Sequence, residues 1–240
     1  MRLTFAGTRG GIDARSPHHA RHSALQITTG GRRLWIDCGL DWLSEVPALQ
    51  ADAILLTHAH PDHALGLQHG APCPVYATAE TWDRLAGLAF DLPRRILPLR
   101  AAWFCQLKIE VHPVFHSFRA PAVALRIAND HKTLFYAPDV AGLADPLSSL
   151  AGVDLYIGDG AAFDDSLLRI EEGIVCGHAP IAQQLEWCAA AGVKRALFTH
   201  CGAAIVTGNE KEQQERVRAL GTRWDIQAAI AYDGLDVTLE

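Results

Sequence analysis

Several features that would identify common protein classes are missing from this sequence. No apolar run among its 240 residues reaches membrane-spanning length, and the first residues lack the apolar segment of a secretory signal. The six cysteines are scattered without a Cys-x-x-Cys pair, which favours reduced thiols over a disulfide framework. From these absences we expect a cytoplasmic protein with no membrane partner. The Gly-rich segment at residues 7–11 lacks a following Gly-Lys-Ser or Gly-Lys-Thr, so it is not a nucleotide P-loop.

Positive charge is also scarce. The chain has 21 Lys and Arg against 27 Asp and Glu, whereas a sequence-independent nucleic-acid binder carries a basic face. We therefore expect no extended nucleic-acid surface, although a local basic patch is compatible with this balance. With 49% hydrophobic residues, no Pro/Ser-rich linker and no internal repeat, residues 1–240 are predicted to form one domain. The sequence does not fix the oligomeric state, and a homodimer is compatible with it.

One short stretch is rich in metal ligands. Residues 58–63 read His-Ala-His-Pro-Asp-His and follow a short apolar run that is typical of a buried strand. His58 and His60 lie two residues apart, so on an extended chain their side chains point to the same side. A helix is expected to begin at the proline, with Asp62 and His63 in its first turn. Imidazoles and carboxylates together suit borderline divalent cations such as zinc, and two groups of ligands indicate two ions.

The pattern His-x-His-x-Asp-His resembles the signature of the metallo-β-lactamase superfamily, and the chain is similar to its members over nearly its whole length. Periodicity alone indicates only an α/β or α+β fold. The resemblance implies a four-layer αββα sandwich, with metal ions in a cleft at one edge of the two sheets. A histidine-rich polar loop without function is the alternative explanation for the motif taken alone.

Three further candidate ligands, His116, Asp139 and His200, each follow a predicted strand. His112 lies on the same strand face as His116 and is its rival, and Asp139 in isolation would be an ordinary turn residue. A carboxylate can bridge two cations, which an imidazole cannot do. The resemblance implies a complete ligand set in which Asp62 is also counted as catalytic: His58, His60 and His116 for one ion, Asp62, His63 and His200 for the other, and Asp139 between them.

Two divalent cations held close together indicate hydrolysis. The ligand set suits Zn²⁺, and Mn²⁺ or Fe²⁺ can also occupy such sites. A shared water loses its proton near neutral pH, and the bridging hydroxide becomes the nucleophile while the ions accept negative charge. We therefore expect a hydrolase that holds two divalent metal ions per chain.

The C-terminal half resembles the phosphodiesterase branch of this family, through Gly177-His178 before a helix, Thr199-His200, and Tyr232-Asp233-Gly234. That branch includes the phosphonate-pathway cyclic phosphodiesterase and the tRNA 3′-end processing endonucleases. The resemblance implies that His178 sits at the catalytic centre, as a general acid or as an electrostatic stabiliser of the phosphoryl group. The alternative is a histidine near a helix start with no catalytic role.

The chain also departs from the relatives of that branch. The phosphonate-pathway enzyme has a cysteine-rich structural zinc site near its N-terminus, and the corresponding loop here contains no cysteine. No insertion resembles the basic arm of the tRNA-processing enzymes, and there is no length for a flavin domain. We therefore expect a small phosphodiester or cyclic phosphate as substrate. The alternatives are hydrolysis of a thioester, lactone or β-lactam on the same centre, and a non-catalytic, metal-stabilised binding protein.

Four other residues are weaker candidates for contacts behind the ligands or with substrate. Asp37 and Asp159 end strands before glycine turns, where a carboxylate either orients a metal-ligating imidazole or simply forms the turn. Arg21 and His22 belong to a cationic stretch, residues 9–22, whose Arg and His side chains suit phosphate oxygens. The alternative for this stretch is a solvated loop without a ligand.

Turn residues and hydrophobic periodicity predict the remaining elements. A hairpin is expected over residues 23–37 and a helical stretch from about 40 to 50. Helices are expected over 181–191 and 210–220. The sequence should end in a pair of strands within 226–240 that turns at Asp233-Gly234.

Overall fold

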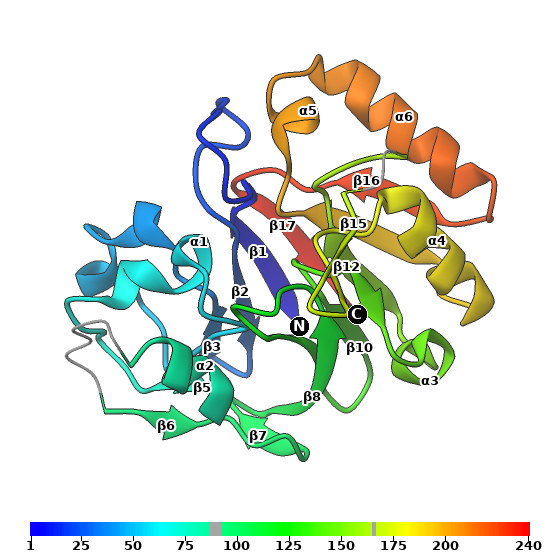
Figure 1. Cartoon of the computed structure of the whole chain (residues 1–240). Coiled ribbons are helices and arrows are strands. Elements are labelled where there is room, and N and C mark those ends of the chain that lie inside the picture. The colour runs from blue at the N-terminus through cyan, green and yellow to red at the C-terminus, as the bar shows by residue number, and fades with distance from the viewer. Residues whose placement is uncertain (87–92, 165–166) are drawn as a thin grey trace.

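Two β-sheets form the centre of the computed structural model, which describes residues 1–86, 93–164 and 167–240 (Figure 1). The first sheet contains, in spatial order, β17 (Leu235–Thr238), β1 (Arg2–Gly7), β2 (Ala24–Thr29), β3 (Arg32–Ile36), β4 (Ala53–Leu55), β5 (Val75–Ala77) and β6 (Arg95–Ile96). The second contains β11 (Gly142–Leu143), β8 (Leu107–Phe115), β9 (Ala122–Ala128), β10 (Thr133–Tyr136), β12 (Leu155–Asp159), β15 (Arg195–Thr199) and β16 (Gln227–Ile230), with β7 (Ala102–Phe104) paired to β8. A separate hairpin joins β13 (Arg169–Glu171) to β14 (Ile174–Cys176).

The core between the two sheets is built from alternate residues of their strands. Leu25 and Ile36 face each other across the β2–β3 pair, and Leu125 and Leu134 lie on β9 and β10 of the second sheet. All four side chains are fully buried and belong to one apolar cluster. Because successive side chains of a strand point to opposite faces, each sheet also has an outer face to cover.

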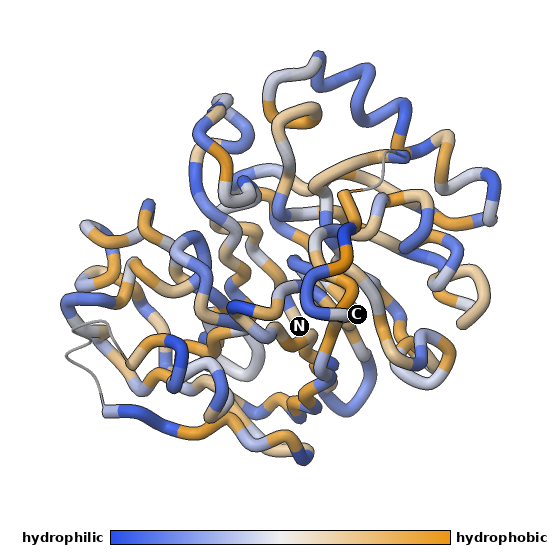
Figure 2. Tube along the Cα trace, in the orientation of Figure 1, coloured by the Kyte–Doolittle hydropathy of each residue, from blue (hydrophilic) through white to orange (hydrophobic). Residues whose placement is uncertain are grey.

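Helices cover both outer faces, so the molecule has four layers. On the first sheet lie η1 (Leu40–Trp42), η2 (Val46–Ala48), α1 (Pro61–Ala64), η3 (Leu65–Leu67) and α2 (Ala79–Arg84), around a cluster that contains Trp35, Trp42 and Ile54. On the second lie α3 (Pro146–Leu150), α4 (Ile181–Ala190), α5 (Ala203–Val206) and α6 (Glu210–Thr222). Hydrophilic residues dominate α6, whose few buried side chains face the sheet (Figure 2). The predicted αββα sandwich is therefore confirmed.

The local predictions had mixed outcomes. The hairpin formed by β2 and β3 and the helices α4 and α6 are confirmed. A continuous helix over residues 40–50 is wrong, because the segment forms two short 3₁₀ turns, η1 and η2. Pro47 lies in the middle of the expected helix, where it lacks an N–H donor and disfavours helical geometry at the residue before it.

The expected pairing of the last two strands is also wrong. β16 runs parallel to β15 in the second sheet, whereas β17 runs antiparallel to β1 in the first. The turn between them is held from outside, since Asp233 accepts hydrogen bonds from the Thr8 hydroxyl at 2.7 Å and the Ala20 amide at 2.9 Å. Strand periodicity identifies two strands but does not say which sheet each one joins.

Several strands end at one shared edge of the two sheets. The residues that follow β3, β4, β8, β10 and β15 include the predicted ligands and Asp37, so the topology gathers side chains that are distant in sequence. None of the helices within the described ranges has the length and apolar character needed to cross a bilayer.

Candidate metal centre

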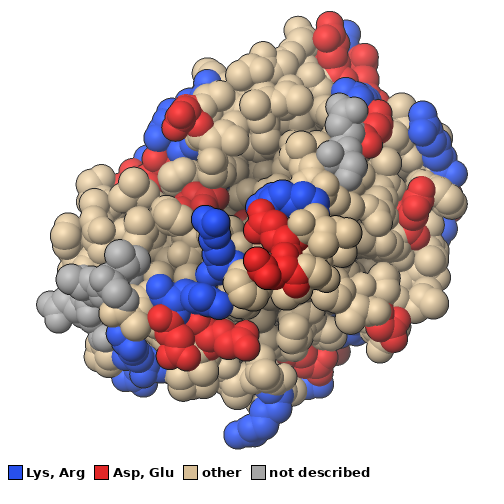
Figure 3. Space-filling view, viewed as in Figure 1, with Lys and Arg blue, Asp and Glu red and all other residues tan. Residues whose placement is uncertain are grey.

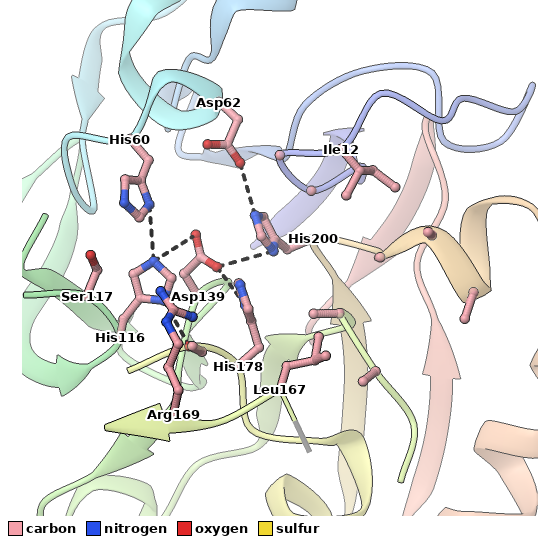
Figure 4. A pocket seen from close by; sticks show the side chains of 18 of the residues that line it. Ile12, His60, Asp62, His116, Ser117, Asp139, Leu167, Arg169, His178 and His200 are labelled. Atoms are coloured by element: carbon pink, nitrogen blue, oxygen red, sulfur yellow. Dashed lines mark hydrogen bonds and ion pairs between the residues drawn. The ribbon is translucent and has the colours of Figure 1, made fainter. Parts of the chain in front are cut away.

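The structure brings all of the predicted metal ligands together at this edge, and Figure 4 shows those that line the cavity, which are His60, Asp62, His116, Asp139 and His200. They come from strand ends and from the first turn of α1, and they form two groups of ligand atoms that share Asp139. Within each group the ligand atoms lie within 4.8 Å of one another. The first group is His58, His60, His116 and Asp139, and the second is Asp62, His63, His200 and Asp139.

The first group is dominated by imidazoles. His60 Nδ1 lies 3.0 Å from His58 Nε2 and 3.2 Å from His116 Nε2. Burial, followed by the neighbouring His116, lowers the pKa of His60 to about 4, which leaves this imidazole neutral and able to bind a cation. His112, the rival of His116, instead packs against the Phe135 ring at 5.3 Å.

The second group contains more negative charge. Asp62 Oδ2 lies 3.2 Å from His200 Nε2 and 3.5 Å from His63 Nε2. Asp139 Oδ2 lies 2.9 Å from His63 Nε2 and 3.2 Å from His58 Nε2, so one carboxylate oxygen is in reach of both groups. Burial opposes ionisation of Asp139, but the surrounding imidazoles outweigh it and hold the pKa of this carboxyl well below its ordinary value.

The donor atoms fit divalent cations. Ligands about 2.1 Å from a tetrahedral ion lie roughly 3.4 Å apart, close to the separations within both groups. His63 Nε2 is buried and makes no hydrogen bond, although Asp139 Oδ2 lies 2.9 Å away. His200 Nδ1 and Asp139 Oδ1 are also buried without a hydrogen bond, 3.3 Å from each other. Buried polar atoms without partners are costly, and a shared cation would satisfy the atoms that face the centre of a group. The residues present therefore fit divalent metal ions.

Other groups fix the orientation of the candidate ligands. Asp37 accepts hydrogen bonds from the Thr57 amide at 2.8 Å and faces His63 Nδ1 at 2.9 Å, which leaves His63 Nε2 pointing at the cluster. His116 Nδ1 donates to the Gly177 carbonyl at 3.1 Å in the same way. Asp37 and His200 both adopt left-handed backbone conformations, with φ of 62° and 53°, as side chains held at a strained strand end do.

His178 lies at the edge of the centre, on the side of Asp159. Its Nδ1 is 2.8 Å from Asp159 Oδ2 and 3.1 Å from Asp139 Oδ1. Burial lowers the pKa of His178, but Asp159 and Asp139 outweigh it and raise the value to about 11. Asp159, Asp139, His178 and His200 thus form a third, overlapping group of potential ligand atoms. The remaining ring nitrogen of His178, Nε2, is the one left for the cavity.

The cationic stretch at residues 9–22 does not bring its charged side chains to the centre. Arg21 pairs with Glu45 and lies over the Trp42 ring, and His22 lies 3.2 Å from an Asp41 carboxylate oxygen. Neither Arg21 nor His22 lines the cavity described below. The stretch reaches the site through Gly10, Gly11 and the Ile12 side chain instead, and a Cβ on Gly11 would stand 2.9 Å from Asp62 Oδ2, so a side chain there would displace this carboxylate.

A cavity of about 740 Å³ opens above the candidate ligands, in the face shown in Figure 3. Its lining includes His60, Asp62, His116, Asp139, His178 and His200, together with the glycines that follow Arg9. It also includes Ser117, Arg119, Arg169 and Glu171, which the sequence reasoning missed. The position of Arg119, three residues after a candidate ligand, was the one signal available, because nothing local indicates that the β13–β14 hairpin folds over the site.

Comparison with known families gives one match to most of the chain. A family model described as "Beta-lactamase superfamily domain" matches residues 32–201. Ribonuclease Z of Bradyrhizobium sp. (strain ORS 278) is 37% identical over 70 residues, which are 27% of this chain and 22% of that protein, so this alignment spans about a fifth of the relative. Ribonuclease Z of Mycobacterium avium (strain 104) is 25% identical over 266 residues and covers 93% of this chain and 92% of its own length.

Solved structures share the fold. YhfI of Bacillus subtilis superimposes with a TM-score of 0.76 at 20% identity, covering 98% of both chains. Zinc-bound PqqB of Methylobacterium extorquens gives 0.77 at 20% identity, with both chains fully covered. A diphosphatase of the PhnP family gives 0.74 at 19% identity, covering 100% of this chain and 98% of that one.

Proposed function

Because this chain belongs to the β-lactamase superfamily, we propose that it is a metal-dependent hydrolase that cleaves a small phosphodiester or cyclic phosphate. The observation that carries the proposal is His178, which stands beside both groups of candidate ligands and is oriented by Asp159. The names of two similar proteins, ribonuclease Z and a PhnP-family diphosphatase, support phosphate ester chemistry.

We assign two divalent metal ions to the centre, with zinc the best match to its histidine-rich donors. His58, His60 and His116 would hold one ion, Asp62, His63 and His200 the other, and Asp139 would be shared. When bound, such ions supply Lewis acidity and lower the pKa of water, which provides the nucleophile and neutralises charge on the phosphoryl oxygens. Zinc-bound PqqB, which has the same fold, supports zinc over Mn²⁺ and Fe²⁺.

The residues around the ions have separate tasks. Asp37 holds a proton on His63 Nδ1, so that His63 Nε2 keeps its lone pair for the ion. Asp159 faces Nδ1 of His178 and directs Nε2 of the protonated imidazole toward the cavity. From there Nε2–H stabilises the phosphoryl oxygens or gives its proton to the departing alkoxide oxygen. Asp62 lines the cavity beside its predicted ion and so bounds the space for the scissile group.

The size and charge of the molecule favour a small substrate. A cavity of about 740 Å³ accommodates a mononucleotide-sized phosphodiester, and the net charge of −6 opposes a sequence-independent hold on nucleic acid. All six cysteines are free, which supports a reducing cytoplasmic location. Whether the protein forms a homodimer is to be tested by analytical ultracentrifugation.

A substrate panel tests this function. The zinc-loaded protein should hydrolyse bis(p-nitrophenyl) phosphate, and chelation of the metal should abolish turnover. A thioester, a lactone and a chromogenic β-lactam serve as comparisons, because a metal-activated hydroxide also attacks a carbonyl carbon. Faster hydrolysis of any acyl substrate than of the phosphodiester would overturn the assignment, and no turnover with a fully loaded centre would favour a binding protein.

A further inference from the structure

Above the candidate metal ligands, the cavity has two chemically different walls. Ile12 and Leu167 contribute apolar surface on the side of His200, whereas Ser117 and Arg169 stand on the side of His116 (Figure 4). Arg119 lines the same cavity and adds a second guanidinium. Figure 3 shows basic and acidic side chains around a hollow in this face of the molecule. Neither guanidinium is among the candidate metal ligands, so the role of these two arginines in the cavity is a separate question.

Arg169 is aimed at the cavity by the β13–β14 hairpin. Arg169 and Glu171 lie two apart on β13 and both line the cavity, while Ile170 between them points away and is 75% exposed. Arg169 Nε donates to Glu171 at 2.6 Å, which orients the guanidinium. Its other two nitrogens have no hydrogen-bond partner among the described residues and remain available for a ligand.

The guanidinium also lies close to the candidate metal ligands. Gly177 has φ of 104°, and a Cβ added to it would stand 3.3 Å from Arg169 Nη1. Gly177 is the residue whose carbonyl accepts the hydrogen bond from His116 Nδ1. Gly177 therefore lies between Arg169 and His116, so the guanidinium borders the first ligand group.

Arg119 approaches from the segment that follows β8. Ser117 Oγ accepts hydrogen bonds from the backbone amides of Arg119 at 3.2 Å and Ala120 at 3.3 Å, which fixes this turn. The Arg119 side chain is exposed, and no ion pair is formed by it within the ranges the structure describes. Arg169 and, to a lesser extent, Arg119 lower the pKa of the Glu171 carboxyl, and all three residues line the same cavity.

Two guanidinium groups against one carboxylate leave this rim positive in a chain whose net charge is −6. Guanidinium presents paired N–H donors that match phosphate oxygens, and its charge persists at every physiological pH. We propose that Arg119 and Arg169 bind a second phosphate of the substrate, carried on the fragment that lies toward β13. This inference rests on the proposed function and specifies its substrate class as a phosphodiester that also bears a phosphate monoester.

Binding to the zinc-loaded protein tests the subsite without turnover. Calorimetry compares thymidine 3′,5′-bisphosphate with thymidine 5′-monophosphate, which differ by one phosphate. The wild-type protein should bind the bisphosphate about tenfold or more tightly, as charge-assisted hydrogen bonds predict. The double variant Arg119→Ala/Arg169→Ala should lose this preference, and Arg119→Lys/Arg169→Lys should keep part of it. Arg223→Ala, an exposed arginine remote from the cavity lining, is the matched control and should keep it all.

Hydrolysis provides the second readout. The p-nitrophenyl ester of thymidine 5′-phosphate is compared with the same ester bearing a 3′-phosphate, and the double alanine variant should raise the KM of the second ester about tenfold more than that of the first. Equal wild-type binding of the two thymidine phosphates, or a preference that survives in the double alanine variant, would overturn the subsite. A thymidine 5′-phosphate with a 3′-succinyl group serves as a carboxylate analogue. If it shows the same arginine-dependent preference over thymidine 5′-monophosphate as the bisphosphate does, the assignment of the subsite to phosphate is overturned. If neither ester is hydrolysed, the proposed function fails, while the calorimetric preference still decides the subsite.

Discussion

Two regions with basic side chains, the loop at residues 9–22 and the rim of the cavity, differ in their surroundings. In the loop, Arg9 and Arg15 share the carboxylate of Asp41, and Arg21 faces Glu45. These pairs use the positive charge to hold the loop against the first sheet and its 3₁₀ turns. The loop therefore shapes the site through its glycines and Ile12, and its charged groups stabilise the fold.

At the rim, Arg119 and Arg169 are fifty residues apart in sequence, and Glu171, which pairs with Arg169, lines the same cavity. Their charge is therefore not fully compensated by the protein. The difference shows that a dense run of basic residues in sequence does not locate an anion site. Basic residues can bind an anion only where acidic side chains from other elements do not pair with them in the folded chain.

Removal of the shared carboxylate should have the largest effect on turnover. It tests the metal centre alone, because it leaves the arginines of both basic regions unchanged. Asp139→Ala should lose both ions and lower kcat/KM by about a thousandfold or more, because the ions supply several kcal/mol of charge stabilisation. Elemental analysis and phosphodiester turnover measure the two effects. Asp130→Ala, in an exposed turn, is the control. Two ions retained by Asp139→Ala would refute a shared ligand.

The next largest effect is expected at His178. His178→Ala should lower kcat by about 10²–10⁴-fold while both ions stay bound, since the residue positions or transfers a proton beside the metals. Turnover and metal content are measured on the same sample, with the exposed His131→Ala as control. Loss of one ion would make His178 a ligand, as its overlap with Asp139 and His200 allows, and unchanged turnover would remove it from the mechanism.

Arg9 tests whether the loop cations are structural. Arg9 is buried and contacts Asp41 and the Ile12 carbonyl, so Arg9→Met should lower the free energy of unfolding by about 3 kcal/mol, as loss of a buried charge partner does. Arg15 pairs with the same carboxylate but its side chain is 54% exposed, and Arg15→Met should cost about 0.5 kcal/mol. Denaturant unfolding compares the two variants, and equal losses would contradict a structural role specific to Arg9.

The smallest effect is expected at Arg21. Its pair with Glu45 is exposed and its guanidinium lies 4.8 Å from the Trp42 ring centroid, so Arg21→Ala should cost about 0.5–1 kcal/mol of stability. Its KM for the 3′-phosphorylated ester should stay within about twofold of the wild-type value, since a solvated side chain outside the cavity adds little binding energy. A KM increase as large as that of the rim variants would show that the loop also reaches the substrate.

The sequence predicted which candidate metal ligands come together because their signals are local. His58, Asp139 and His200 each follow an apolar run, and the ends of neighbouring strands meet at one edge of a sheet. The cavity rim was not predictable in this way. Arg169 reaches the site only because β13 folds back over Gly177, a contact between segments that no spacing encodes. Likewise, Asp41 and Glu45 could be identified as partners of the loop cations only in the folded chain.

The last two strands illustrate the same limit. β16 and β17 have the strand periodicity that was expected, yet they join different sheets, and the turn between them is anchored beside the end of β1 by the hydrogen bond from Thr8 to Asp233. The helix expected over residues 40–50 failed for a local reason, the proline within it.

Zinc titration of the metal-free protein, with hydrolysis of bis(p-nitrophenyl) phosphate followed at each addition, tests the dinuclear phosphodiesterase most directly. Two groups of ligands that share Asp139 predict that activity rises to a plateau at two equivalents per chain. A plateau at one equivalent, or hydrolysis of an acyl substrate with none of the phosphodiester at full loading, would contradict it.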